Sequence, residues 1–77
     1  MSKVKINIEL TKDEAIVLFA FLAEFNKKDN NELFSDQAEQ RVLWDIECVL
    51  EKQLSEPLKA DYLEIVRQAR EKIRDRE

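Results

Sequence analysis

The sequence has no glycine and no histidine, and it has one cysteine and one proline in 77 residues. Without glycine it has neither a glycine-rich phosphate-binding loop nor the sharp turn that presents a nucleophilic serine in hydrolases. Without histidine it lacks the most common general base and the most common zinc ligand. The single thiol, Cys48, cannot form a disulfide within the chain, and only carboxylates are available to it as bases. We therefore expect no enzymatic activity, no cofactor and no metal.

Two further consequences concern asparagine and glutamate. Helix ends that need a left-handed residue must use asparagine in place of glycine, and Asn26, Asn30 and Asn31 are placed to do so. Glu47 and Glu51 lie one helical turn apart, but helical carboxylate metal sites also need histidine partners. We expect these two carboxylates to form a solvated acidic surface.

The net charge of −4 is unevenly distributed. Residues 29–56 carry two basic and eight acidic side chains, whereas the segments on either side each have a charge of +1. A general attraction to nucleic acid or to an anionic membrane is therefore not expected. The apolar stretch 15–23 is too short to span a bilayer and follows acidic residues, unlike a signal peptide. With its lone thiol, the chain is predicted to be cytoplasmic.

The size of the chain limits its core. For a mass of 9.2 kDa, area scaling predicts a folded surface of about 4,900 Å² and burial of about 63% of the unfolded surface. Residues 1–77 are therefore predicted to form a single small, mostly helical domain with no large internal cavity. Because disulfides and metals are excluded, oligomerisation is the remaining way to add stability.

Residues 3–10 alternate strictly between polar and apolar side chains, which is typical of a half-buried β-strand. The apolar positions are Val4, Ile6, Ile8 and Leu10. A single strand cannot satisfy its own backbone. We expect it to pair either with the short stretch 32–34 or with a second chain.

Three helices are predicted after the strand. The first runs over 12–25 and begins with a capping box formed by Thr11 and Glu14. The second begins after Ser35 or Asp36 and runs to about residue 54, and the third covers about 59–75 after a break at Pro57. The expected fold is therefore α+β but predominantly α, with one N-terminal β-strand followed by three helices (β-α-α-α).

The phrases IELTKDEAIVLF and DQAEQRVLWDIE resemble a family of small uncharacterised bacterial intracellular proteins. The resemblance covers most of the chain. It implies a bacterial intracellular protein, and it carries over no functional residue.

One candidate partner-binding site lies on the predicted second helix. Trp44 and Cys48 are four residues apart, beside Arg41, on the side opposite the apolar stripe of that helix. Tryptophan and arginine are favoured at binding hot spots. The alternative is that this helix is a middle layer that packs on both sides, in which case Trp44 belongs to the core.

The pattern also predicts a homodimer. The first helix is apolar around nearly its whole circumference, and the strand lacks a full-length partner within the chain. A symmetric dimer would answer both problems. The predicted dimer interface consists of Ile6, Ile8, Phe19, Phe21 and Leu22.

These features predict a non-catalytic protein-interaction module, acting as an adaptor, antitoxin or immunity protein by binding another protein. The alternative is a dimeric ribbon–helix–helix-like DNA-binding regulator, which would lay Lys3, Lys5 and Asn7 in the major groove. The acidic middle of the chain makes nucleic acid the less favoured partner.

Overall fold

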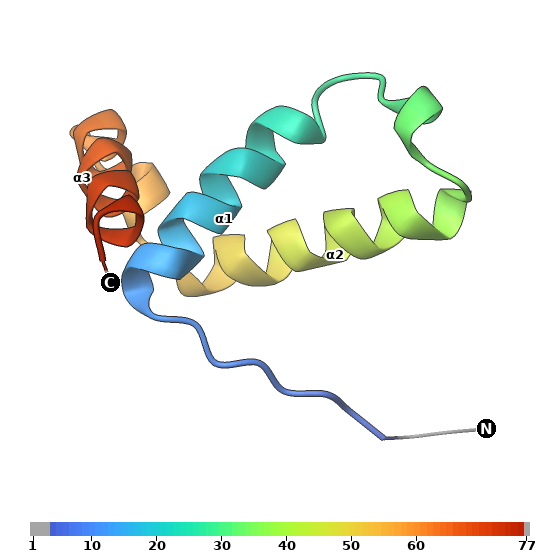
Figure 1. The fold of residues 1–77 in the computed structure, drawn as a ribbon, viewed down its shortest axis with the longest axis horizontal. Coiled ribbons are helices and arrows are strands. Elements are labelled where there is room, and N and C mark those ends of the chain that lie inside the picture. Colours follow the sequence, from blue (N-terminus) through green and yellow to red (C-terminus); the bar gives the residue numbers. More distant parts are fainter. Residues whose placement is uncertain (1–3, 77) are drawn as a thin grey trace.

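Helix α1 (Lys12–Phe25) is the central element of the protein, whose computed structural model describes residues 4–76 (Figure 1). Helix α2 (Gln37–Gln53) runs below it, and helix α3 (Tyr62–Arg74) lies across its N-terminal end. Both pack against α1. Two short 3-10 turns, η1 (Asn31–Leu33) and η2 (Glu56–Leu58), lie in the connections. The middle layer is therefore α1, and the alternative that made the second helix a middle layer is wrong.

The start of α1 follows from its sequence. The hydroxyl oxygen of Thr11 accepts a hydrogen bond from the amide of Glu14 at 3.1 Å, and a Glu14 carboxylate oxygen accepts one from the amide of Thr11 at 2.9 Å. This reciprocal arrangement satisfies two backbone donors that the helix leaves without internal partners. The predicted capping box and the bounds 12–25 are both confirmed.

The other two helices also begin and end at sequence signals. Asp36 caps α2 by accepting from the amide of Ala38 at 2.7 Å, and Glu39 reaches back to the amide of Ser35 at 2.8 Å. The turn η2, which contains the only proline, separates α2 from α3. Helix α3 begins three residues later than the predicted residue 59, because residues 59–61 form a turn.

The asparagine prediction is wrong for this chain. None of the described residues has a positive φ angle. Asn26 ends α1 in a right-handed conformation, with φ −75°. Asn30 instead donates a side-chain hydrogen bond of 2.7 Å to the carbonyl of Phe25, which accepts it at the C-terminal end of α1. The side-chain amide of Asn30 thus satisfies a carbonyl at the end of the helix, a role that the backbone amide of a left-handed residue often fills.

The predicted N-terminal strand is also wrong, and with it the β-α-α-α fold. The first residue of the predicted strand 3–10 lies outside the described residues. Residues 4–10 follow an extended path (Figure 1), yet no β-strand or sheet forms within residues 4–76. The stretch 32–34, expected as a possible partner, lies largely in the turn η1 and is not available for strand pairing. The alternation of polar and apolar side chains therefore indicates an extended backbone here, but it does not indicate hydrogen bonding to a second strand. The described chain is predominantly helical.

The core lies where α1 meets α3. The buried side chains that cluster there are Ile16, Phe19, Ala20, Leu54, Val66 and Ala69, and Leu22 of α1 is buried outside this cluster. The apolar stripe of α3 faces α1, and small Ala69 lets the two helices approach closely. No helix within residues 4–76 combines the length and the apolar character needed to cross a membrane.

Candidate protein-binding site

Helix α2 differs from its neighbours because it contains no buried residue. At about 100° per residue, its side chains fall into three sets roughly 120° apart. One set, with Leu50 at its centre, packs on the core. A second set consists of Val42, Ile46 and Val49, and a third of Arg41, Trp44 and Cys48. Both of these sets are exposed, so α2 presents two apolar-containing surfaces to the surroundings.

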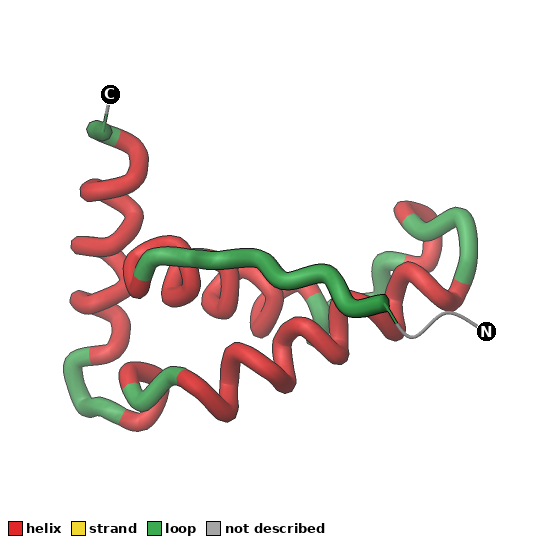
Figure 2. The backbone as a smooth tube through the Cα atoms, turned by 90° about the horizontal axis from the view of Figure 1, so that it is seen from below, coloured by secondary structure: helices red, strands yellow, loops and turns green. Residues whose placement is uncertain are grey.

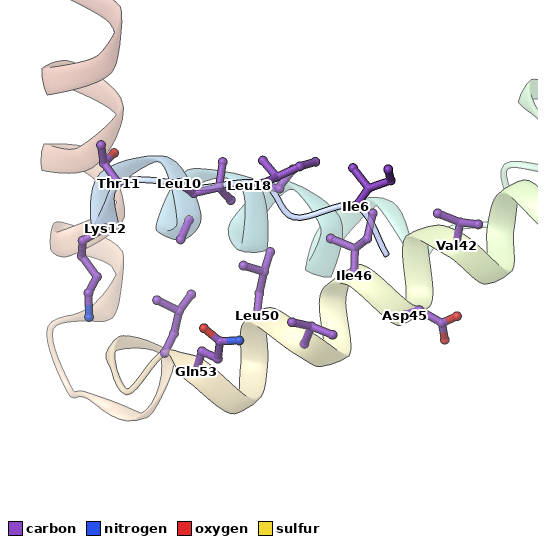
Figure 3. Close-up of a pocket in the computed structure, with 14 residues that line it drawn as sticks. Ile6, Leu10, Thr11, Lys12, Leu18, Val42, Asp45, Ile46, Leu50 and Gln53 are labelled. Carbon is purple, nitrogen blue, oxygen red and sulfur yellow. The ribbon is translucent and has the colours of Figure 1, made fainter. Parts of the chain in front are cut away.

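The first surface forms one wall of a groove. The N-terminal segment 4–10 lies along the underside of α1 and α2, roughly parallel to α2 and antiparallel to α1 (Figures 1 and 2). A groove of about 680 Å³ lies between this segment, α1 and α2. Figure 3 shows Ile6 and Leu10 on one side and Ile46 and Leu50 on the other. We call the exposed rim of this groove the groove face, defined by Ile6, Ile8, Val42, Ile46 and Val49.

The groove is almost entirely apolar. Of the residues that line it, Lys12 and Asp45 are the only charged ones, and they lie at opposite ends (Figure 3). Lys12 Nζ also forms an ion pair of 3.3 Å with Glu56 Oε2. The pKa of Glu56 lies below its ordinary value, mainly because its carboxylate accepts a hydrogen bond from its own backbone amide and also because Lys12 is close. An apolar lining of this kind suits burial of aliphatic side chains.

The second surface, which we call the Trp44 face, consists of Arg41, Trp44 and Cys48. The side chain of Trp44 is 43% exposed, and Cys48 is a free, exposed thiol. All three residues are exposed on α2. The structure therefore brings together the three residues that the sequence singled out, on a surface that is open to a partner.

The predicted dimer-interface residues are distributed over different environments. Ile6 and Ile8 lie on the groove face, where they are about 80% exposed. Phe19 and Leu22 are buried inside the chain and are not available to a partner. Phe21 is exposed on α1, where its ring stacks on Phe25 with centroids 5.4 Å apart.

Val42, Ile46 and Val49 were not among the predicted site residues, because their spacing assigned them to the core stripe of the second helix. The signal that distinguishes them is the width of that stripe. The apolar positions of α2 cover a wider arc than one neighbouring helix can bury. The Leu50 set packs on the core, and the remaining apolar positions are left exposed. The excess side of the arc is the groove face.

Several charged side chains outside the groove have polar partners within the chain. Arg76 donates to Glu14 at 2.9 Å and joins the end of α3 to the start of α1. Arg67 bridges Glu64 and Glu71 on the surface of α3. Glu47 of α2 accepts a 2.7 Å hydrogen bond from Asn26. Within residues 4–76, no three histidine, cysteine, aspartate or glutamate side chains come together as metal ligands would.

Comparison with known proteins gave no match to a family model, to a curated protein or to a solved structure. The function of the chain is therefore argued from its own surfaces, of which the two exposed sides of α2 are the most distinctive.

Proposed function

We propose that the protein is a non-catalytic protein-interaction module that binds another protein chain through α2. The observation that carries this proposal is that α2 has no buried residue although it bears the only tryptophan and a row of aliphatic side chains. A helix of 17 residues normally gains most of its stability by burying an apolar face. A partner that covers α2 would supply that burial.

The Trp44 face is the surface we assign to a different protein. Tryptophan and arginine dominate binding hot spots, because they combine a large apolar area with hydrogen-bonding groups. Trp44 has an indole N–H and Arg41 a guanidinium group, so this face offers donors beside an apolar ring. The exposed thiol of Cys48 favours a reducing compartment, for which we propose the cytoplasm.

The chemistry of the groove supports binding over catalysis. Its two charged side chains, Lys12 and Asp45, lie at opposite ends, so no acid–base pair faces a common point in it (Figure 3). The acidic middle of the chain, with a charge of −6 over residues 29–56, includes all of α2. Phosphate backbones would be repelled by this segment, which favours a protein partner over DNA.

The test is partner capture from the native host with the wild-type protein and two variants. Trp44→Ala removes the proposed anchor, and Phe21→Ala is the matched control, since it truncates an aromatic side chain that is 56% exposed on α1. We expect a hot-spot loss with Trp44→Ala, about 30-fold or more in affinity, and none with Phe21→Ala. Equal binding by wild type and Trp44→Ala, with both variants shown to be folded by circular dichroism, would contradict the proposal.

A further inference from the structure

The chain exposes more surface than a compact monomer of its mass. A monomer of 9.2 kDa is expected to expose about 4,900 Å². This chain exposes 6672 Å². Its radius of gyration is 14.2 Å, compared with about 11.5 Å expected for a compact chain of this length. The excess of about 1,700 Å² is larger than the roughly 800 Å² that each partner buries in a standard protein interface.

Several exposed aliphatic side chains gather on the groove face. Ile6 and Ile8 are 82% and 79% exposed, and Val42 and Val49 are each 54% exposed. These side chains form one continuous apolar surface around the groove, contributed by two segments that are distant in the sequence. Single exposed aliphatic residues are common on monomers, but a contiguous patch of this kind marks an interaction site.

The groove face holds both a ridge and a hollow. It contains a ridge, formed by the extended segment 4–10, directly beside a hollow of about 680 Å³. A two-fold rotation can therefore place the ridge of one copy in the hollow of the other. The lining carries one positive and one negative side chain, Lys12 and Asp45, so it has no net charge. A second copy is thus not repelled at this face, although the whole chain has a charge of −4.

We propose that a second copy of this chain covers the groove face and forms a symmetric homodimer in which Ile6 and Ile8 of each copy contact the groove of the other. The surface is isologous, meaning that the same residues contribute from both copies. This site is separate from the Trp44 face, which lies on another side of α2 and stays accessible in the dimer. The dimer test and the partner test use different substitutions, so failure of one proposal can be told apart from failure of the other.

The test measures molecular mass by light scattering and sedimentation equilibrium from micromolar to near-millimolar concentration. Wild type is expected at twice 9.2 kDa. Ile8→Asp and Val49→Asp, tested separately, each place a carboxylate inside the proposed interface. Each is expected to weaken dimerisation by about 30-fold or more. Leu63→Asp is the matched control, because Leu63 is 82% exposed on α3, away from the groove, and this variant is expected to remain dimeric.

Both groove residues are exposed in the single chain, so their substitution is expected to leave the fold of the monomer intact, which circular dichroism checks. A wild-type mass that stays at 9.2 kDa at all concentrations would overturn the proposal. So would a dimer that persists in both Ile8→Asp and Val49→Asp, or one that is lost only in Leu63→Asp. Trp44→Ala serves as a second control and is expected to keep the dimer while losing the other partner.

Discussion

The two helices that pack on α1 use their apolar residues in different ways. Helix α3 has a narrow apolar stripe, and its contact with α1 buries Val66 and Ala69. Helix α2 has apolar side chains over a wider arc, and its contact with α1 leaves every residue of the helix at least partly exposed. One neighbouring helix is enough to cover a narrow stripe but not a wide arc. The stripe of α3 that contains Val66 and Ala69 is therefore covered within one chain, whereas the apolar arc of α2 is open to a further chain.

The largest expected effect is a substitution in the shared core. Phe19 is 7% exposed and lies among the residues that join α1 to α3. Phe19→Ala removes a buried ring and leaves a cavity, so we expect a loss of about 3–5 kcal/mol in the free energy of unfolding. Urea unfolding followed by circular dichroism measures this change. A loss below about 1 kcal/mol would mean that the core is not where the structure places it.

A second substitution tests the close approach of α3. Ala69 is 1% exposed against α1. Ala69→Leu adds volume to a packed contact, and overpacking of this kind costs about 1–3 kcal/mol. The same urea titration shows the result, and Cys48→Leu on the exposed side of α2 is a suitable control with little expected effect. Comparable losses in the two variants would remove the distinction between the closed and the open side.

The ion pair between Glu14 and Arg76 gives a smaller, pH-dependent effect on the α3 side. The pKa of Glu14 lies below its ordinary value of 4.5, because its carboxylate accepts a hydrogen bond from the Thr11 backbone and a further one from Arg76. A lowered folded-state pKa contributes stability above the unfolded pKa, and this stability is lost as the pH falls through the folded pKa.

Glu14→Gln removes this titration. The difference in urea midpoint between wild type and Glu14→Gln is therefore expected to be largest at neutral pH and to shrink as the pH falls below 4.5. A difference that is independent of pH would show that Glu14 acts only as a neutral cap.

The smallest expected effect is on the open side. Trp44 is exposed within the single chain, so Trp44→Ala is expected to change the free energy of unfolding by only about 0.5 kcal/mol. Chemical unfolding at a low protein concentration, where the monomer dominates, is the appropriate measurement. If Trp44→Ala instead cost as much as Phe19→Ala, Trp44 would belong to the core and not to a binding surface.

The sequence predicted the helices better than it predicted their surroundings. The capping box at Thr11 and Glu14 depends on local hydrogen bonds, which are encoded within four residues, and it placed the start of α1 correctly. The alternation in residues 3–10 is also local, but a strand needs a second segment, and no property of these eight residues says whether one is present. The extended conformation was therefore predictable, and the strand was not.

The candidate site was predictable to the same limited degree. The separation of Trp44 from the Leu50 side of α2 follows from helical periodicity alone. The exposure of Val42 and Val49 does not, since a wide apolar arc is covered fully by two neighbouring helices but only in part by one. The outcome depends on where α3 packs. Because α3 packs on α1, α2 has α1 as its helical neighbour and part of its apolar arc stays exposed.

Amide hydrogen exchange at low and high protein concentration tests the contrast between the two sides most directly. If a second chain completes the α2 side, the amides of α2 open by local unfolding in the monomer and are protected by association. We predict that protection over residues 37–53 rises with concentration more than protection over residues 62–74. Equal protection of the two helices, unchanged between the two concentrations, would contradict the account.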